Sequence, residues 1–545
     1  MTIKKIFSLI AISGIMQQAH AQQILYPETK TVDQVDDYFG TKISDPYRWL
    51  ENDTSAETAE WVKLQNLGTS AFLNKLPQRA LLQKRLTELW NYARYSAPSK
   101  HGKYYVFSKN DGLQNQAVLY IQNGINGKAD VLLDPNKLST DGTVALQATS
   151  FSKSKKYFAY STSASGSDWQ VIQVMDPLTK KLLQDKIDYV KFTSIAWKED
   201  EGFFYSGYSR PADEKTKFSV RSEFQKIFYH KIGTPQSQDL LIYEDKQHPL
   251  RYVGSFVTED DKYLVLNITE GTNGNEIRYR ELKKENAPFQ TLVPGFKTNS
   301  YVEDNDGDKF IVRTNHNAPN YKLVLIDPKK PSPENWKTLI PEAKEALTDI
   351  NTGGEKLFAS YLKDASTLVK QFNRSGVLEH VVKLPGIGTA SGFGSKKEDK
   401  EFYYTFTSFN YPPTIFKYDT RTGKSTLYRK SEANFDPTQF ESKQVFATSK
   451  DGTKVPLFIT HKKGLKLDGT NPCLLYAYGG FNVNLTPSFS VANIPFLEQN
   501  GVYVVANLRG GGEYGEDWHR GGMLEKKQNV FDDFIGAAQY VIDQK

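Results

Sequence analysis

The stretch best suited to chemistry is the short loop Tyr478-Gly479-Gly480-Phe481. An apolar run from Leu474 to Ala477 precedes it and is too short for a buried helix, so the loop is expected to follow a core strand. Glycines let the backbone approach a reacting carbonyl closely, and a tyrosine hydroxyl can donate to the negative charge that develops there. The residues alone fit an oxyanion hole, and they fit equally a tight turn between two packed aromatic rings.

A second Gly-rich stretch, Gly510-Gly511-Gly512-Glu513-Tyr514-Gly515, has the G-x-G-x-x-G spacing of a dinucleotide site. Asp532 and Asp533 follow about twenty residues later, as such a site requires. However, we expect no helix directly after Gly515, and Gly521-Gly522 interrupts the place where that helix should run. The stretch is therefore interpreted as a structural turn, and no cofactor is expected.

Histidine, serine and cysteine give no second candidate centre. The eight histidines neither cluster nor form H-E-x-x-H, so no metal site is predicted. His519 is expected to be a structural loop residue. Ser391, in Gly388-Thr389-Ala390-Ser391-Gly392, misses the G-x-S-x-G register, and that motif occurs nowhere in the sequence. The single cysteine, Cys473, can form no internal disulfide and is expected to be a buried, inert thiol.

Several predicted elements surround the two Gly-rich stretches. Residues 502–508 form another apolar, β-branched run that ends in Arg509-Gly510, so two core strands end in Gly-rich turns. This pattern indicates an α/β sheet with a site at the carboxyl ends of its strands. The other predicted elements are a hairpin of residues 445–448 and 455–460 around Asp451-Gly452, a short helical crossover at 494–499, and a helix at 529–542 capped by Asn529.

The middle of the chain predicts a β-propeller. Short aromatic strands recur roughly every 45 to 60 residues, which is the length of a four-stranded blade, and each is followed by a second strand about fifteen residues later. No helical pattern lies between them, and the alternative is an array of β-sandwiches. Seven such strands can be counted: Lys103–Phe107, Lys156–Tyr160, Gly202–Tyr205, Lys262–Leu266, Lys309–Val312, Lys356–Ala359 and Glu401–Tyr404.

The N-terminus reads as a secretory signal. Lys4 and Lys5 precede an apolar run, and Ala19-His20-Ala21 fits a cleavage site, so the predicted signal peptide is residues 1–21 and the mature protein is exported to the periplasm or beyond. Residues 22–94 follow with a mainly helical pattern. No later apolar run is long enough to predict a membrane span.

The charge and composition of the chain limit the classes of partner that can be expected. The formal net charge is +6 with the charges dispersed, so no nucleic-acid footprint is predicted. Aromatic residues make up 13% of the chain, which favours β-rich structure. At 545 residues the chain is too long for one core, so at least two domains are expected.

Motifs along nearly the whole mature chain resemble the prolyl oligopeptidase family of serine peptidases. The similarity spans both the predicted propeller and the region after it. The motifs are Asp45–Glu51, Gly112–Gln116, Leu133–Asn136, Asp141–Leu146, Gly166–Trp169, Tyr476–Asn482, Arg509–Gly515 and Trp518-His519.

This resemblance implies a seven-bladed β-propeller at 95–443 and the first part of an α/β-hydrolase domain at 444–545, on which residues 22–94 would pack. It implies cleavage of short peptides after proline, with the protein expected to be a monomer. Tyr478 would donate its hydroxyl to the oxyanion, and Phe481 would line the proline pocket. Asp168 would lie near the amino end of the substrate, and Phe192 would face the same cavity.

One departure from the family pattern concerns the catalytic triad. In α/β-hydrolases the serine, aspartate and histidine follow the third-strand loop in that order, so all three are expected beyond Lys545. The chain by itself is therefore expected to be inactive. The alternative function, from a different class, is a non-catalytic propeller module that binds peptides or proteins.

Overall fold

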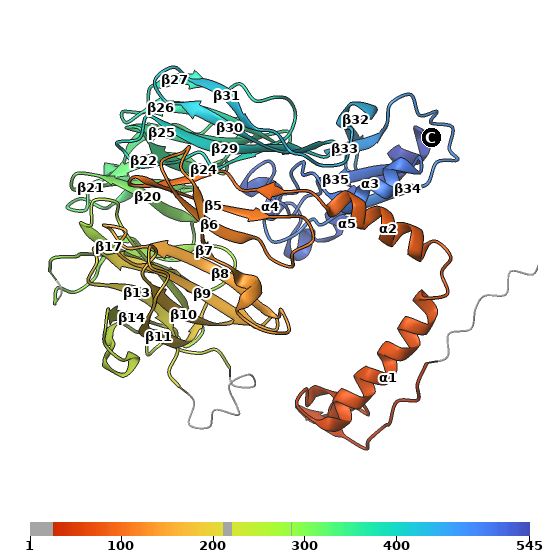
Figure 1. The fold of residues 1–545 in the computed structure, drawn as a ribbon, viewed down its shortest axis with the longest axis horizontal. Coiled ribbons are helices and arrows are strands. Elements are labelled where there is room, and N and C mark those ends of the chain that lie inside the picture. The colour runs from red at the N-terminus through yellow and green to blue at the C-terminus, as the bar shows by residue number, and fades with distance from the viewer. Residues whose placement is uncertain (1–25, 211–220, 285) are drawn as a thin grey trace, which may run out of the picture. The chain divides into compact units, whose positions relative to one another are not determined.

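The computed structural model describes residues 26–210, 221–284 and 286–545 of the chain. The predicted signal peptide, residues 1–21, lies outside these residues. The chain divides into two compact units, residues 1–85 and 86–545 (Figure 1).

The described part of the first unit is a hairpin followed by helices. The hairpin pairs β1 (Val35–Tyr38) with β2 (Thr41–Ser44), and a short 3₁₀ turn, Arg48–Glu51, follows. Helix α1 (Ala56–Leu73) begins where the hydroxyl of Ser55 accepts the amide of Thr58, which satisfies one of the free N–H groups at the helix start. Helix α2 (Arg79–Trp90) crosses the unit boundary.

The second unit contains a seven-bladed β-propeller, as the sequence predicted. Among the described residues, seven antiparallel groups of strands follow one another along the chain, and blades 2 and 3 are joined through the single pair Val190 and Gly207. The strands of blades 1 to 4 are β3 (Arg94–Tyr95), β4 (Ser99–His101), β5 (Tyr104–Asn110), β6 (Val118–Asn123) and β7 (Ala129–Leu133); β8 (Val144–Phe151), β9 (Phe158–Ala164), β10 (Trp169–Met175) and β11 (Leu182–Lys191); β12 (Ala196–Lys198), β13 (Gly202–Gly207), β14 (Lys226–Lys231) and β15 (Leu240–Tyr243); and β16 (Tyr252–Val257), β17 (Tyr263–Thr269), β18 (Asn275–Glu281) and β19 (Gln290–Val293). Those of blades 5 to 7 are β20 (Ser300–Asp306), β21 (Lys309–Thr314), β22 (Lys322–Ile326) and β23 (Lys337–Ile340); β24 (Ala346–Gly353), β25 (Lys356–Lys363), β26 (Ser366–Asn373) and β27 (Leu378–Val381); and β28 (Thr389–Ser391), β29 (Glu401–Ser408), β30 (Tyr411–Asp419) and β31 (Lys424–Arg429).

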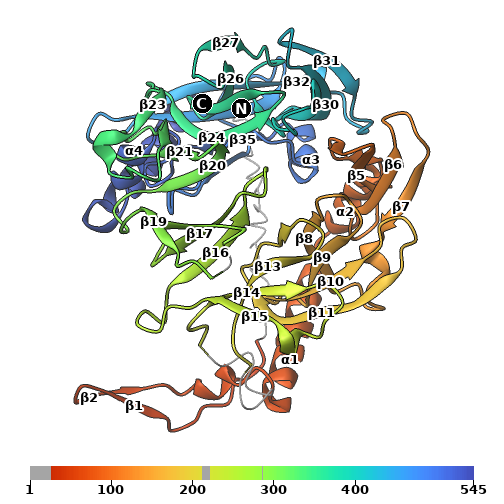
Figure 2. The same cartoon turned by 90° about the vertical axis from the view of Figure 1, so that its left-hand side faces the viewer.

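Each blade packs its apolar side chains against the next blade. The aromatic strands that recur in the sequence supply these cores: Phe158 and Tyr160 pack against Val106 of blade 1, and Phe310 of blade 5 packs against Tyr263 of blade 4. Separate apolar clusters join blades 2 and 3, 3 and 4, 5 and 6, and 6 and 7 in the same way. Six sequential apolar interfaces among the described residues thus hold the seven blades together. Figure 2 labels strands of all seven blades.

Blade 7 meets blade 1 through side chains. The strand β4 of blade 1 lies beside β29 of blade 7. Lys100 forms an ion pair with the buried carboxylate of Asp399, and the rings of Tyr105 and Tyr403 meet edge to face with centroids 6.3 Å apart. In the described chain each of these two blades is built from consecutive strands, so neither lends a strand to the other.

A four-stranded sheet follows the propeller in the order β32-β33-β35-β34. Its strands are β32 (Phe440–Thr448), β33 (Lys454–Lys462), β34 (Cys473–Ala477) and β35 (Val502–Ala506). The hairpin β32–β33 turns at Gly452, whose φ of 88° requires glycine, and β34 runs parallel to β35. Helix α3 (Ile494–Glu498) is the predicted crossover, and α5 (Gln528–Asp543) packs Val530 and Ala537 onto the sheet core.

The sequence-based assignments need three local corrections. Cys473 is exposed, because it begins the edge strand of this sheet, although partial burial still raises the pKa of its thiol. Helix α5 begins at Gln528, and the side chain of Asn529 donates to the carbonyl of Gly521 instead of capping the helix. A five-residue helix, α4 (Glu516–Arg520), does open directly after Gly515, so His519 is helical and buried.

The start of the second unit packs on this sheet region. Leu89 and Tyr92 contact Phe440, Ile494 and Leu497 in one apolar cluster. These contacts involve only the residues from Leu86 onward, so the predicted packing of residues 22–85 remains a prediction.

Candidate functional site

The loop Tyr478-Gly479-Gly480-Phe481 begins directly after β34, at the carboxyl end of that strand. Gly479 has a φ of 64°, and a Cβ there would lie 2.5 Å from the side chain of Val530 on α5, so only glycine fits. Phe481 and Asn482 both adopt left-handed φ values, of 52° and 60°. Such a turn is costly for residues with side chains, and it persists where surrounding contacts fix it.

The second Gly-rich stretch lies against this loop. The amide of Asn482 donates to the carbonyl of Gly510 over 3.0 Å, and the amide of Gly512 donates to the side chain of Asn484 over 3.1 Å. A Cβ on Gly510 would lie 2.7 Å from the carbonyl oxygen of Gly479. The glycines therefore allow two backbone segments to touch, as the structural interpretation of the motif predicted.

Two cations fix the surroundings of the loop. The ammonium of Lys527 donates to the carbonyl of Gly479 over 2.9 Å. The guanidinium of Arg509 is buried, and it forms an ion pair with the fully buried carboxylate of Asp533 at 2.6 Å and a second one with Asp451. Since Asp533 lies on α5 and Asp451 lies on the β32–β33 turn, Arg509 links both elements to its own Gly-rich turn.

The two predicted site residues on the loop are exposed. Tyr478 is 50% exposed and Phe481 is 70% exposed, although both adjoin tightly packed backbone. A hydroxyl and an apolar ring presented to solvent from a fixed loop can contact a bound molecule without any rearrangement of the core. Their assignment to the oxyanion and to the proline ring remains a prediction.

The two predicted propeller residues lie close to each other. Asp168 precedes β10, and its carboxylate lies 3.5 Å from the ammonium of Lys191. The same ammonium lies 5.1 Å from the ring centroid of Phe192, which is half exposed and meets the edge of Tyr252. Among the described residues, no hydrogen bond, ion pair or ring contact joins this pair to Tyr478 or Phe481. The four predicted site residues therefore form two separate groups, one in the propeller and one on the loop.

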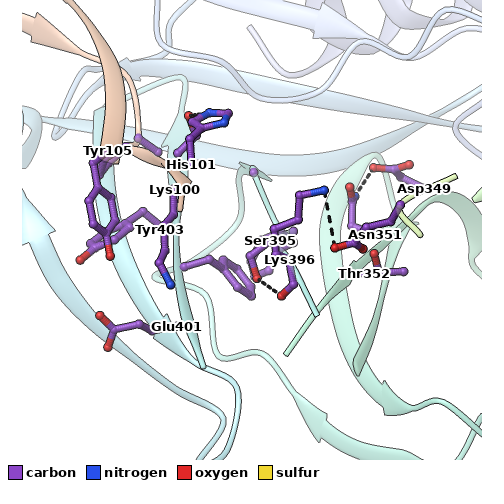
Figure 3. A pocket seen from close by; sticks show the side chains of 18 of the residues that line it. Lys100, His101, Tyr105, Asp349, Asn351, Thr352, Ser395, Lys396, Glu401 and Tyr403 are labelled. Atoms are coloured by element: carbon purple, nitrogen blue, oxygen red, sulfur yellow. Dashed lines mark hydrogen bonds and ion pairs between the residues drawn. The ribbon is translucent and has the colours of Figure 1, made fainter. Parts of the chain in front are cut away.

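A cavity of about 700 Å³ lies among the inner ends of blades 1, 4, 5, 6 and 7. Figure 3 shows Tyr105, Tyr403 and Glu401 on one side of it and Asp349, Asn351 and Thr352 on the other, with Ser395 and Lys396 between them. The sequence patterns did not single out these residues. They lie on strands or in loops whose pattern signals only the blade, and their convergence depends on the closure of the ring.

Burial shifts the pKa values of two side chains that line this cavity. Burial raises the pKa of Glu303 to about 7, against the lowering effect of its 2.8 Å ion pair with Arg313. Burial also lowers the pKa of His101 to about 4, and the nearby Lys155 and Lys396 add to that shift. At neutral pH His101 is therefore uncharged.

A second cavity, of about 290 Å³, shares Asp349, Asn351, Gly392 and Phe393 with the first. Asn484 and Thr486, which follow the loop of Phe481, line its other side. The two cavities therefore share a wall, and the second one reaches the segment directly after the candidate loop.

The described residues show no arrangement of three or more histidine, cysteine, aspartate or glutamate side chains suited to hold a metal ion. Over the same residues, no helix has both the length and the apolar character that crossing a membrane requires.

These features define a β-propeller combined with part of an α/β-hydrolase domain. Residues 27–431 match the family model described as "Prolyl oligopeptidase, N-terminal beta-propeller domain", and residues 487–545 match the one described as "Prolyl oligopeptidase family". The chain belongs to the prolyl oligopeptidase family of serine peptidases, as the sequence motifs indicated.

Individual relatives agree with this assignment. A prolyl endopeptidase of Elizabethkingia meningoseptica is 48% identical over 98% of this chain and 75% of its own length. The dual function macrocyclase-peptidase POPB of Galerina marginata is 34% identical over 95% of this chain and 76% of its own. The chain thus spans about three quarters of the length of these relatives.

Solved structures show the same fold. A chain from a structural and mechanistic analysis of two prolyl endopeptidases has a TM-score of 0.90 and 38% identity, and it covers 96% of this chain and 77% of its own length. The Galerina marginata enzyme bound to a 25mer macrocyclization substrate has a TM-score of 0.87 and 32% identity, over 95% and 77% of the two chains.

Proposed function

We propose that this chain forms the substrate cavity, the oxyanion donor and the proline-binding wall of a peptidase that cleaves short peptides after proline. The nucleophilic serine and its aspartate and histidine partners are not supplied by residues 1–545 in this proposal. Tyr478 donates its hydroxyl to the oxyanion, and Phe481 packs on the proline ring. Asp168 and Phe192 contact the part of the peptide on the amino side of the proline.

The observation that carries the proposal is the loop after β34. Its glycines fix the backbone against the Gly510–Gly512 turn, and this leaves Tyr478 and Phe481 presented to solvent. Preorganised donors aimed at the place where charge develops are usually the largest contribution to acyl-transfer catalysis. The prolyl endopeptidase relatives support proline as the substrate residue.

The proposal is tested with a chimera in which residues 1–545 are joined to the C-terminal quarter of the Elizabethkingia meningoseptica relative. We expect this protein to hydrolyse a Gly-Pro amide reporter, and a Gly-Ala reporter to react far more slowly. The 545-residue chain alone is expected to be inactive, because binding and oxyanion donors without a nucleophile leave only a small remnant of the rate. Turnover by the purified chain itself would contradict that part of the proposal.

We also propose that the protein is exported. The charged and apolar pattern of residues 4–16 and the Ala19-His20-Ala21 site support this location. Expression of the natural gene, followed by separation of cytosolic from exported protein and by N-terminal sequencing, is expected to find a mature chain that begins near Gln22. A cytosolic protein that still carries Met1 would overturn this proposal.

A further inference from the structure

The candidate loop is also held at its far end, by a buried acid. Glu513 lies in the Gly-rich turn and is 1% exposed. Its Oε1 accepts the amide of Leu485 over 3.0 Å and the side-chain amide of Asn507 over 3.1 Å. The same Asn507 amide donates to the carbonyl of Leu485 over 2.7 Å. Glu513 and Asn507 together therefore satisfy both backbone groups of Leu485.

Leu485 is where the loop rejoins the core. Its side chain packs with Phe409, Phe458 and Val505, the last two on the strands β33 and β35. Between Gly479 and Leu485 the chain passes through the two left-handed residues, which need external contacts to keep their conformation. The hydrogen bonds at Leu485 thus fix one end of the segment that carries Phe481, and Lys527 fixes the other at Gly479.

The surroundings of Glu513 suit a neutral acid. Among the described residues no lysine, arginine or histidine forms an ion pair with it, and the nearest cation of the turn, Arg509, is already paired with Asp533 and Asp451. The Oε2 atom of Glu513 and the Oδ1 atom of Asn507 are both buried with no hydrogen-bond partner among those residues. An unpaired buried carboxylate is strongly disfavoured relative to the neutral acid.

Space around Oε2 is also tight. A Cβ added to Gly511 would lie 2.2 Å from Oε2 and 2.9 Å from the carbonyl oxygen of Val483, so both oxygens face the same side of that glycine. Val483 belongs to the loop. The missing side chain at Gly511 therefore lets the carboxyl of Glu513 and the loop approach the same place.

We propose that Glu513, in its uncharged form, is a positioning residue that holds the segment Gly479–Leu485 in its substrate-binding conformation. The consequence of this inference for catalysis rests on the proposed function. The role of Glu513 in holding the segment does not depend on it. Glu513 touches no substrate in this scheme and acts through the backbone of Leu485.

The titration of Glu513 gives the proposal a distinctive signature. Burial raises the pKa of its carboxyl, against the lowering effect of the hydrogen bonds from Leu485 and Asn507. The other titratable group beside it is Tyr514, whose hydroxyl donates to Asp364 and whose pKa is raised by burial. Because the folded pKa of Glu513 is raised, its stabilising effect is complete at low pH and is lost as the pH rises through that folded pKa.

The test is hydrogen exchange of the amides of residues 479–486 in the 545-residue chain, measured by mass spectrometry from pH 5 to pH 9. Glu513→Ala is expected to raise the exchange rate of this segment about tenfold, the effect of losing one buried hydrogen bond. Glu513→Gln is expected to retain the protection. Protection in the wild type is expected to fall as the pH rises, after correction for intrinsic exchange, whereas in Glu513→Gln it stays constant.

Glu525→Gln, a change at an exposed position in the turn before α5, is the matched control and should leave the segment unchanged. The proposal is overturned if Glu513→Gln loosens the segment as much as Glu513→Ala, or if wild-type protection is independent of pH. Since exchange needs no turnover, an inactive chimera would count against the proposed function without affecting this result.

Discussion

Two tyrosines close together in the sequence have different surroundings in the structure. Tyr476 lies within β34, while Tyr478 follows the strand and adjoins Gly479 and Gly480. The backbone of Gly479 lies close to Arg509 and Gly510, and its carbonyl accepts a hydrogen bond from Lys527. Both rings are about half exposed. Position relative to the strand end, and not exposure, therefore separates the candidate donor from its neighbour.

This difference leads to a first prediction. In the chimera, Tyr478→Phe is expected to lower kcat about 10²-fold with little change in KM, which is the cost of one oxyanion donor. The measurement is steady-state kinetics on the Gly-Pro amide reporter. Tyr476→Phe is the control, with both constants expected to stay near the wild-type values. If Tyr478→Phe keeps its full kcat, Tyr478 is not the donor.

At the scale of elements, the Gly-rich turn depends on the buried ion pair between Arg509 and Asp533. Asp533→Asn leaves the guanidinium without its buried counter-ion, although Asp451 remains as a partial substitute. Breaking a buried pair on one side costs about 3–5 kcal/mol in general, so we expect a loss of roughly that size in the free energy of unfolding of this region.

Chemical denaturation of the chain, followed by a probe in the sheet region, measures this loss. Asp532→Asn is the matched control, because Asp532 is the adjacent residue on α5, is only partly buried, and has a carboxylate bonded only to Gln528 among the described residues. Equal stability of the two variants would show that the Arg509 cluster contributes little.

The junction of blades 2 and 3 contains a second buried charge cluster. His230 on β14 is fully buried between Asp185 on β11 and Asp239, with contacts of 2.9 and 2.7 Å. Burial lowers the pKa of His230, but the hydrogen bonds to the two carboxylates outweigh that effect and raise it to about 9. The charged imidazole therefore stabilises the junction up to mildly alkaline pH.

The raised pKa of His230 determines how the stability of the propeller changes with pH. A histidine with a raised folded pKa gives its full stabilisation below its unfolded pKa of about 6.5 and loses it as the pH rises through the folded value. We expect the thermal midpoint of the propeller to fall between pH 6.5 and pH 9, and this slope to be reduced in His230→Gln. His248→Gln, which removes an exposed histidine paired with Asp245, should keep the wild-type slope.

Sequence patterns predicted elements well where a regular spacing of apolar residues determines the packing. The recurring aromatic strands gave the seven blades because each blade buries its own aromatic residues against the next. Predictions failed at the ends of elements: Cys473 depends on which strand lies at the sheet edge, and the start of α5 depends on what Asn529 contacts. Local sequence carries neither kind of information.

The site was predictable only in part for the same reason. Tyr478 and Phe481 stand beside glycines that signal a special backbone conformation. Glu513 was visible as part of a motif, but its role depends on a partner 28 positions earlier, Leu485. Glu303 and Asp349 of the cavity are ordinary strand residues in sequence, and the packing of blade 5 on blade 6 brings them together.

At the scale of the whole molecule, we expect the cavity inside the propeller to limit the size of the substrate. A volume of about 700 Å³ lies in the range of a drug-sized ligand and can hold only a few amino-acid residues. We expect the chimera to cleave a short Gly-Pro peptide, and to leave the same sequence uncut when it is placed within a folded protein. Mass spectrometry of the products after equal incubation measures the difference, and cleavage of the folded carrier would contradict a size limit set by the cavity.

The two ends of the propeller meet at one place. Arg429, the last residue of β31, places its guanidinium 3.7 Å from the ring centroid of Tyr95 on β3, and the two segments line one small cavity together. A module whose entry and exit adjoin can be gained or removed by a host domain without separating the strands on either side. The propeller can therefore be treated as an insertable module. It could be grafted between two adjacent residues of another hydrolase, and in this protein it could be replaced with a short linker.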